Sequence, residues 1–152
     1  MTKEDEIYLK MEYVQNAESD WQLKPSGLWY SIENHWIDWC QSEMEERIYQ
    51  NIFSLEIDES RLLKIDTIDN LMAFQMQYEN GLPGLSKSIA WINLVKEKKY
   101  AGIEFLNYWR IKKQTLNLPD WRTMWYWSID VPSGCIWDLS AIIAIEKIEL
   151  VK

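Results

Sequence analysis

Histidine and cysteine are scarce in this chain, and their scarcity excludes several kinds of site. His35 is the only histidine, and Cys40 and Cys135 are the only cysteines, among 152 residues. A zinc site needs three or four ligands, and a disulfide scaffold needs more cysteine. His35 and Cys40 point about 140° away from each other if they share a helix, so they form no local Cys–His pair. We therefore expect no metal site and a reduced, cytoplasmic protein.

Long apolar runs and the common catalytic motifs are also missing. The longest apolar run, "SAIIAI", has the length of a strand, whereas a membrane-spanning helix needs about 20 apolar residues. The first residues, "MTKEDEIYLK", contain no apolar signal segment. Glycine-rich phosphate loops and the Walker, HExxH, CxxC and GxSxG motifs are absent. We expect no membrane partner, and the usual hydrolase and kinase mechanisms have no support.

Basic residues are outnumbered by acidic ones. The chain has 16 lysines and arginines and 24 aspartates and glutamates, which give a net charge of −8 and a pI near 4.7. Proteins that bind the nucleic-acid backbone concentrate lysine and arginine, so we expect no direct binding to a phosphate backbone. The acidic balance instead favours solubility, attraction to a basic partner or imitation of nucleic acid.

Aromatic residues, in contrast, are abundant. The chain has 10 tryptophans and 8 tyrosines, and each such ring buries roughly 150–250 Å² when it packs inside a protein. A small core rarely needs so many rings, and the tryptophan N–H and tyrosine O–H groups require hydrogen-bond partners. Some of these rings should therefore lie at the rim of the core or on a binding face.

The spacing of apolar residues predicts a single α+β domain over residues 1–152, with residues 1–6 frayed. Alternating patterns predict strands, and apolar residues at helical spacing predict about three helices. The predicted strands lie at 8–14, 28–31, 101–109, 124–130 and within 135–150, with a β-hairpin at 51–66; the predicted helices lie near 34–49, 67–78 and 89–98. Residues 112–123 are predicted to form a loop. The uneven alternation of strands and helices favours α+β over a doubly wound sheet.

The stretch "KPSGLWYS", which begins at Lys24, allows two interpretations. Pro25 holds Lys24 extended, and Gly27 lets the backbone approach a neighbour or makes a turn. In a functional interpretation, Trp29 and Ser31 face a cleft at the end of a strand, with Lys24 nearby. In a structural interpretation, the stretch is a turn into an aromatic core strand, and Ser31 caps the following helix.

Two acidic residues near the end of the chain are candidates for chemistry. Glu104 alternates with Ile103 and Phe105, so it lies on the wet face of a sheet unless that face borders a cleft. In a cleft it becomes a candidate acid or base. Asp130 precedes a Val-Pro-Ser-Gly turn in the tryptophan-rich stretch "WSIDVPSGCIWD". It either provides a carboxylate in an aromatic pocket or caps the turn through backbone amides.

Two stretches resemble motifs of a family of small bacterial and phage proteins. "LKPSGLWYSIENHWIDWC" resembles the pattern KPxGLWxS…WxxWC, and "GIE" followed by "WYWSIDVPSGCIWD" resembles GIE…WYxWDxxSGCIW. The family is ADP-ribosyltransferase-like, and the resemblance implies a split β-sheet core that holds NAD between two small sheets. Ile129 departs from the pattern, which has a tryptophan before the aspartate, and this departure removes a ring that could line the pocket.

The resemblance also identifies candidate site residues by position. The positions that match its motifs are Lys24, Gly27, Trp29, Ser31, Glu104, Asp130, Ser133, Gly134, Cys135 and Trp137. A dinucleotide brings a diphosphate, which the acidic composition does not help to bind. A local cation would have to bind it, and the candidates are Lys24, Arg110 and Arg122.

The resemblance implies the following chemistry for these residues. Trp29 or Trp127 stacks on the nicotinamide ring, and Ser31 binds its amide or the ribose. Glu104 or Asp130 stabilises the oxocarbenium-like centre as the glycosidic bond breaks. Nicotinamide leaves as a neutral molecule, so no general acid is needed. ADP-ribose would then pass to a macromolecular target, either a protein or a nucleic acid.

Two further interpretations stay open at this point. An acidic, aromatic-rich chain also suits a binding or inhibitor protein, for example one encoded by a phage, that blocks a basic partner without catalysis. Alternatively, the resemblance marks the fold alone and the site is degenerate. The enzymatic interpretation requires Ser31, Glu104 and Asp130 to meet in one cleft with tryptophan walls.

Overall fold

The computed structural model describes residues 13, 15, 23–43, 51–80, 88–118 and 121–148, without the side chains of residues 121 and 122. The strands are β1 (Leu28–Ser31), β2 (Ile52–Ile57), β3 (Leu62–Ile65), β4 (Gly102–Phe105), β5 (Ser133–Ile136) and β6 (Ile142–Ile148). The α-helices are α1 (His35–Glu43), α2 (Ile68–Tyr78), α3 (Trp91–Lys96) and α4 (Tyr108–Thr115). Three 3₁₀ helices complete the set: η1 (Glu59–Arg61), η2 (Trp121–Ser128) and η3 (Leu139–Ala141). The α+β prediction is confirmed, with more helices than expected in the described residues.

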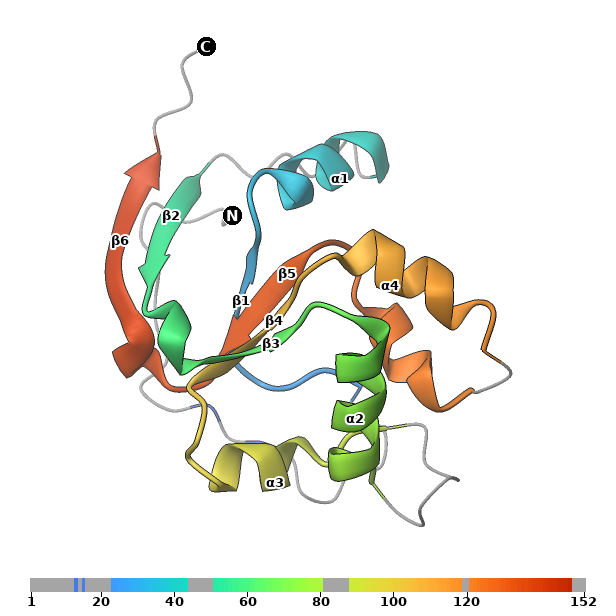
Figure 1. Cartoon of the computed structure of the whole chain (residues 1–152). Coiled ribbons are helices and arrows are strands. Elements are labelled where there is room, and N and C mark those ends of the chain that lie inside the picture. The colour runs from blue at the N-terminus through green and yellow to red at the C-terminus, as the bar shows by residue number, and fades with distance from the viewer. Residues whose placement is uncertain are drawn as a thin grey trace.

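The strands form two separate sheets. The larger sheet has four strands in the order β1-β5-β4-β3, in which β3 and β4 are parallel and the other neighbours are antiparallel. The smaller sheet consists of β2 and β6 in an antiparallel pair. Figure 1 shows the small sheet on one side of the large sheet and α2, α3 and α4 on the other. The β structure is therefore divided into two sheets, and α2, α3 and α4 lie on the side of the large sheet away from the small one (Figure 1).

Two 3₁₀ helices carry the chain from one sheet to the other: η1 leads from β2 to β3, and η3 leads from β5 to β6. Each begins with an aspartate N-cap. Asp58 accepts a hydrogen bond from the N–H of Ser60, and Asp138 accepts one from the N–H of Ser140. Arg61 joins the two crossovers, since its Nη2 lies 2.7 Å from Oδ2 of Asp138. The crossovers therefore hold the two sheets in a fixed relation.

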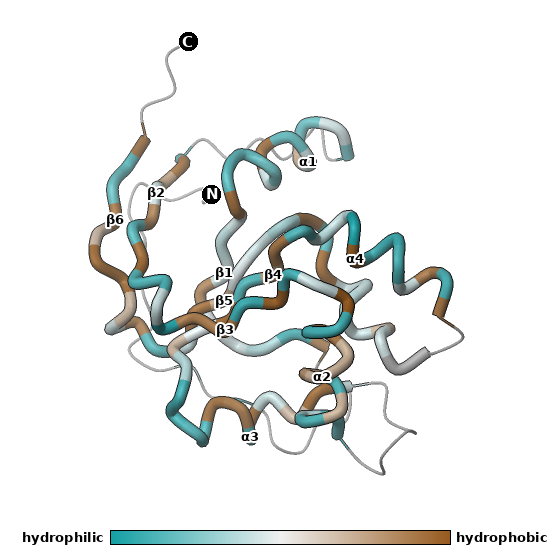
Figure 2. Tube along the Cα trace, viewed as in Figure 1, coloured by the Kyte–Doolittle hydropathy of each residue, from teal (hydrophilic) through white to brown (hydrophobic). Residues whose placement is uncertain are grey.

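The core lies between the large sheet and the helices. Its buried side chains include Ile65, Leu71, Phe74, Trp91, Leu94, Ile103, Phe105, Tyr108, Ile111, Trp125 and Tyr126. Figure 2 shows hydrophobic segments where α2 and α3 approach the sheet and hydrophilic residues along the outer edge of α4. Trp91 and Trp125 are buried, whereas Trp109 and Trp127 are 53% and 41% exposed. The prediction that some rings lie outside the core is confirmed.

The β-hairpin predicted for residues 51–66 is wrong. Both strands exist, but β2 pairs with β6 and β3 pairs with β4. Ser54 of β2 lies opposite Glu146, which is 92 residues away in the sequence. Alternation of apolar residues identifies a strand but not its partner, because pairing depends on which other strand offers a complementary face.

The strand predicted for 101–109 ends early, and α4 replaces its last residues and the start of the loop predicted for 112–123. Asn107 adopts the left-handed conformation, with φ of 49°, which asparagine tolerates better than most residues. The chain turns there and buries Tyr108 and Ile111 on one face of the new helix. The prediction failed because tyrosine and tryptophan favour strands in isolation.

The strand predicted for 124–130 is wrong as well, because these residues mostly belong to η2. Trp125 and Tyr126 are adjacent and both fully buried, whereas consecutive side chains of a strand point to opposite faces. The ring of Trp125 packs at 5.6 Å from that of Phe74, and the ring of Tyr126 at 5.4 Å from that of Tyr108. Packing of the rings into the core outweighs the strand preference of the aromatic run.

The remaining elements follow the predictions. Strand β1 and helices α2 and α3 lie where the pattern placed them, and the hydroxyl of Thr67 accepts a hydrogen bond from Asn70 N–H at the start of α2. Helix α1 covers the described part of the helix predicted for 34–49. The strand predicted for 8–14 lies, apart from residue 13, outside the described residues, and so does the end of the first helix.

Candidate functional site

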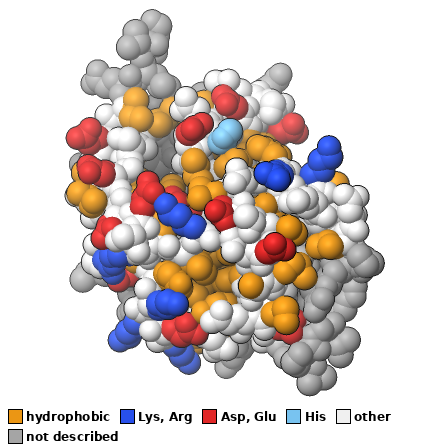
Figure 3. All heavy atoms as spheres, in the orientation of Figure 1, with side chains coloured by type: hydrophobic (Ala, Val, Ile, Leu, Met, Phe, Trp, Pro, Cys, Tyr) orange, Lys and Arg blue, Asp and Glu red, His pale blue; other side chains and the backbone are white. Residues whose placement is uncertain are grey.

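A cavity of about 960 Å³ lies between the two sheets. Strands β1, β4 and β5 line it from the large sheet, β2 and β6 line it from the small sheet, and α1 contributes Trp36 and Ile37. Figure 3 shows acidic, basic and hydrophobic side chains gathered between the small sheet and the centre of the molecule. The volume lies at the upper end of the range for small-molecule sites, roughly 300–1,000 Å³. The cavity is therefore large enough for a small-molecule ligand.

Six of the positions that match the motifs line this cavity: Lys24, Trp29, Ser31, Glu104, Asp130 and Ser133. They come from β1 and the loop before it, from β4, and from β5 and the loop before it. The antiparallel pairing of β5 with both β1 and β4 brings these distant segments together. Ser31, Glu104 and Asp130 therefore line one cavity, as the enzymatic interpretation requires.

A row of side chains crosses the cavity face of the large sheet. Tyr30, Gly134 and Glu104 lie side by side on β1, β5 and β4. The hydroxyl of Tyr30 donates a hydrogen bond of 2.7 Å to Oε1 of Glu104. Gly134 makes this contact possible, because a Cβ at that position would lie 2.3 Å from the end of the Tyr30 ring. The ring of Tyr30 crosses over β5, so its hydroxyl reaches the carboxylate of Glu104.

Glu104 is a buried carboxylate, with only 8% of the residue exposed. Its Oε2 lies 3.9 Å from Nζ of Lys64, and Lys64 also pairs with Glu59 at 2.5 Å. Burial, the hydrogen bond to Glu104 and the charge of Glu104 raise the pKa of Tyr30 well above its usual value. The hydroxyl of Tyr30 therefore stays protonated and remains a hydrogen-bond donor at neutral pH. The hydrogen bond to Glu59 raises the pKa of Lys64, so its ammonium stays charged beside Glu104.

Lys24 and Asp130 pair with each other at one side of the cavity. Nζ of Lys24 lies 3.6 Å from Oδ2 of Asp130, and both side chains are about 40% exposed. Lys24 also lies over the ring of Trp29, 5.6 Å from its centroid. Exposed ion pairs contribute roughly 0–1 kcal/mol, so this pair can open at little cost. Of the two candidate carboxylates, Glu104 is the buried and preorganised one, and Asp130 is the exposed one.

Trp29 and Ser31 have structural roles in addition to lining the cavity. Nε1 of Trp29 donates to the carbonyl of Pro25 at 3.2 Å, and its ring is nearly parallel to that of Phe105 at 6.4 Å. The hydroxyl of Ser31 accepts a hydrogen bond of 3.2 Å from Trp36 N–H in the first turn of α1. The structural interpretation of Ser31 as a helix cap is confirmed, and the same residue borders the cavity.

Gly27 and Trp127 do not line the cavity. Gly27 lies against β5, where a Cβ would be 2.4 Å from Sγ of Cys135, so glycine serves the close approach of the backbone. Trp127 lies beside α4 and donates from Nε1 to Oγ1 of Thr115 at 3.1 Å. The expectation that Trp127 stacks on a ligand in this cavity is therefore not met. Arg110 is exposed on α4 and does not line the cavity either.

The sequence prediction missed Tyr30, Trp36 and Glu59, which also line the cavity. Tyr30 alternates with Trp29 along β1, so the pattern alone places the two on opposite faces without saying which face borders the cleft. The register with Gly134 answers that question, because it puts Tyr30 in the same row as Glu104.

The thiols and carboxylates form no metal centre within the described residues. No group of three or more histidine, cysteine, aspartate or glutamate side chains in this part of the chain could hold a metal ion. Cys40 and Cys135 are free, and burial raises the pKa of both thiols. None of the described helices is long and apolar enough to cross a membrane.

No protein-family model, curated protein or solved structure gives a significant match to this chain. Function is therefore inferred from the geometry and charge of the cavity.

Proposed function

We propose that this chain is an ADP-ribosyltransferase-like protein that binds NAD in the cavity between the sheets and transfers ADP-ribose to a macromolecular target. The observation that carries this proposal is the convergence of Ser31, Glu104 and Asp130 on one cavity with tryptophan in its walls. These residues belong to the motifs on which the resemblance rests, so the motif positions and the cavity support the same function.

The charges of the cavity suit one end of NAD particularly well. Among the described lining residues, Glu33, Glu59, Glu104 and Asp130 are acidic, and Lys24 is basic. Carboxylates attract the cationic nicotinamide ring, and aromatic faces add to that attraction. Lys24 is the lining residue that can bind the diphosphate, once it exchanges Asp130 for a phosphate oxygen. The carboxylates therefore suit the nicotinamide and ribose end of NAD, and Lys24 suits its diphosphate.

Glu104 would provide the main catalytic effect. Bound NAD supplies a cationic ring that departs as neutral nicotinamide, so the protein needs no general acid. Glu104 is a buried carboxylate in the wall of the cavity, and stabilisation of developing positive charge by such a group contributes several kcal/mol when the bound substrate displaces water. Tyr30 holds that carboxylate in place, so no reorganisation is needed during the reaction. Trp36 would provide an aromatic wall that orients the ring, whereas the ring of Trp29 packs against Phe105 on the other face of the large sheet.

Binding and transfer are measured separately to test this proposal. Tryptophan fluorescence is titrated with NAD to millimolar concentration, and labelled NAD is used to detect transfer to proteins or nucleic acids in a bacterial lysate. Glu104→Gln should reduce labelling by about 100-fold or more. Glu56→Gln is the matched control, because Glu56 is exposed on β2 and does not line the cavity. Absence of both a fluorescence change and labelling in the wild type would contradict the proposal.

A double variant distinguishes the enzyme from a binding or inhibitor protein. An inhibitor that acts through its overall charge of −8 forms a salt-sensitive complex with a basic partner, and that complex survives Glu104→Ala combined with Asp130→Ala. Loss of NAD-dependent labelling in this variant, with unchanged folding by circular dichroism, supports the enzyme. A complex that persists in the variant, without any labelling by the wild type, supports the inhibitor.

A further inference from the structure

Large apolar side chains are exposed together on one part of the surface. The residues concerned are Trp109, Leu116, Met124 and Trp127, which are 53%, 63%, 55% and 41% exposed. They lie on or at the end of α4 and on η2. Single exposed apolar side chains are common, but a cluster of them marks an interaction surface.

The spacing within each helix makes this surface continuous. Trp109, Lys112, Lys113 and Leu116 recur at i, i+3, i+4 and i+7, which places them on one stripe of a helix. Met124 and Trp127 are three residues apart in a 3₁₀ helix, where such side chains eclipse each other. We call these six residues the α4–η2 surface.

Two contacts join the two helices of the α4–η2 surface. Nε1 of Trp127 donates to Oγ1 of Thr115 at 3.1 Å. Nζ of Lys112 lies 5.7 Å from the centroid of the Trp127 ring. The indole of η2 is therefore held against α4, and the apolar and basic groups form one patch.

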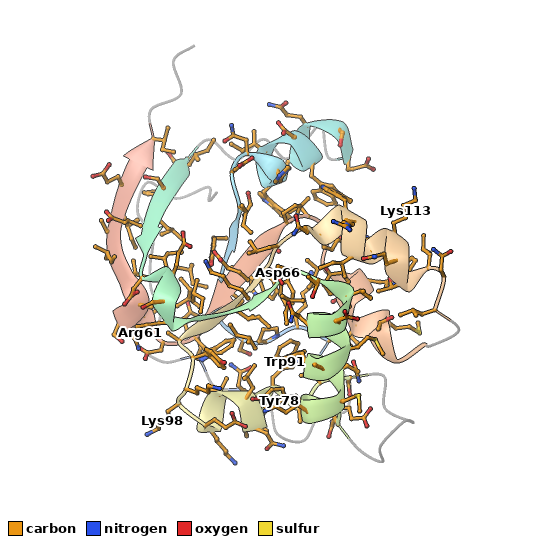
Figure 4. All side chains as sticks on the ribbon, viewed as in Figure 1. Arg61, Asp66, Tyr78, Trp91, Lys98 and Lys113 are labelled. Carbon is orange, nitrogen blue, oxygen red and sulfur yellow. The ribbon has the colours of Figure 1, made fainter. Side chains whose placement is uncertain are left out.

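The charge of this surface is opposite to that of the whole protein. Helix α4 carries Arg110, Lys112 and Lys113, and neither α4 nor η2 contains an acidic residue, although the chain has a net charge of −8. Figure 4 shows Lys113 pointing away from the ribbon of α4, and basic side chains lie beside hydrophobic ones over this helix in Figure 3. Charge complementarity therefore favours an acidic partner.

From this combination we propose that the α4–η2 surface is a docking site for an acidic peptide segment with apolar side chains. Tryptophan, methionine and arginine are enriched at protein interfaces, where a few anchors provide most of the affinity. Leu116 and Met124 provide apolar contacts that the leucine-like side chains of a peptide would bury, whereas a nucleobase would use only the rings of Trp109 and Trp127. A nucleic acid carries one charge per phosphate along its whole length, so the net charge of −8 repels it more strongly than it repels a short acidic segment. A protein segment is therefore the partner that fits both the apolar and the basic groups.

Two hydrogen bonds link the α4–η2 surface, which lies on the helix side of the large sheet (Figure 1), to the wall of the cavity. Nζ of Lys112 donates to Oη of Tyr108 at 2.6 Å, and Oη of Tyr108 donates to the carbonyl of Ile129. Ile129 and its neighbour Asp130 line the cavity. A segment bound on the surface would thus tether the target protein to the molecule that holds the proposed NAD site. This last role depends on the proposed function, whereas peptide binding itself does not.

Fluorescence anisotropy with defined probes tests the docking site. The main probe is a fluorescein-labelled synthetic helical peptide of glutamate and leucine. Its counterparts have glutamine for glutamate or serine for leucine, and labelled oligothymidine represents nucleic acid. The glutamate–leucine peptide should bind in a salt-sensitive manner, and each altered peptide should bind at least about tenfold more weakly.

Variants locate the binding on the protein. Trp109→Ala and Lys113→Glu should each weaken binding of the glutamate–leucine peptide about tenfold or more. The matched control is Lys96→Glu, which makes the same charge change at an exposed site in α3 and should bind as the wild type does. Glu104→Gln should also bind the peptide normally, so failure of the NAD proposal leaves this result unchanged.

Several outcomes would overturn the docking proposal. Equal binding of the glutamate and glutamine peptides removes the charge argument, and normal binding by Trp109→Ala and the charge-reversal variant removes the location. Tighter binding of oligothymidine, lost in the same variants, identifies a nucleic-acid surface instead. Absence of binding by any probe to the folded wild type also rejects the proposal, whatever the result of the NAD experiments.

Discussion

The hydroxyl of Tyr30 reaches across strand β5 and donates a 2.7 Å hydrogen bond to Oε1 of Glu104, a residue 74 positions later in the chain. This contact holds a buried carboxylate in the wall of the cavity between the sheets. It depends on Gly134, which lies between the two residues and leaves room for the tyrosine ring. The contact therefore depends on residues of three strands, β1, β5 and β4. Its contribution to the free energy of unfolding can be measured.

Tyr30→Phe removes the hydroxyl and keeps the ring. Because a buried carboxylate loses a hydrogen-bond donor, the free energy of unfolding at pH 7 should fall by about 1–3 kcal/mol, as measured by urea unfolding. NAD-dependent labelling should fall about tenfold, since Glu104 is no longer held in place. Tyr100→Phe is the control, because Tyr100 does not line the cavity. Unfolding curves that do not differ between Tyr30→Phe and the wild type would contradict the proposed role of the contact.

Gly134→Ala places a methyl group where the Tyr30 ring lies. Overpacking of this kind should lower the free energy of unfolding by about 1–3 kcal/mol. In a Tyr30→Ala background the ring is absent. There, Gly134→Ala should lower the free energy of unfolding by at least about 1 kcal/mol less than it does in the wild type. A double-mutant cycle by urea unfolding measures this difference. Strictly additive effects would show that the ring does not pass over Gly134 as described.

Ser31→Ala removes the side-chain acceptor for the first turn of α1. Loss of a helix cap should lower the free energy of unfolding by about 1 kcal/mol, and Ser31→Thr should restore most of it because threonine also caps. Ser42→Ala serves as the control, since Ser42 is exposed in the last turn of the same helix and its hydroxyl donates to the carbonyl of Trp39. If the two alanine variants lose the same stability, the capping role of Ser31 is refuted.

Asp138→Ala tests the link between the two crossovers. Hydrogen bonds from Ser140, and then the charge of Arg61, lower the pKa of Asp138. Because the folded pKa lies below the unfolded value of about 3.9, the stabilisation is complete above about pH 4 and is lost as the pH falls through the folded pKa. The variant should be about 1 kcal/mol less stable at pH 7, and urea unfolding below about pH 4 should show a smaller difference. A difference that stays constant down to pH 3 would be inconsistent with a lowered pKa.

The local hydrophobic pattern predicted the elements whose environment is local. Helix α2 buries Leu71, Phe74 and Tyr78 at helical spacing, and Thr67 caps it, so the sequence contains all the information needed. Residues 51–66 and 124–130 were misjudged for the opposite reason. The pairing of β2 with β6, and the packing of Trp125 and Tyr126 in the core, depend on groups that are distant in the sequence.

The same division applies to the candidate site. The residue types and motif positions pointed to Lys24, Trp29, Ser31, Glu104 and Asp130, and all of them line the cavity. Tyr30 was missed and Trp127 was misplaced, because a strand pattern does not say which face borders a cleft, and an aromatic run does not say which of its rings is exposed.

The amino-acid sequence by itself determined the acidic charge, the scarcity of histidine and cysteine, the α+β class and three of the four described α-helices, because these follow from composition and from contacts within a few residues. Only the tertiary structure decided that Tyr30 rather than Trp127 belongs to the cavity, that Glu104 is buried, and that α4 presents a basic and apolar stripe. The physical reason is that the faces of strands and helices acquire their environment from partners far along the chain, and those partners are chosen only when the whole core packs.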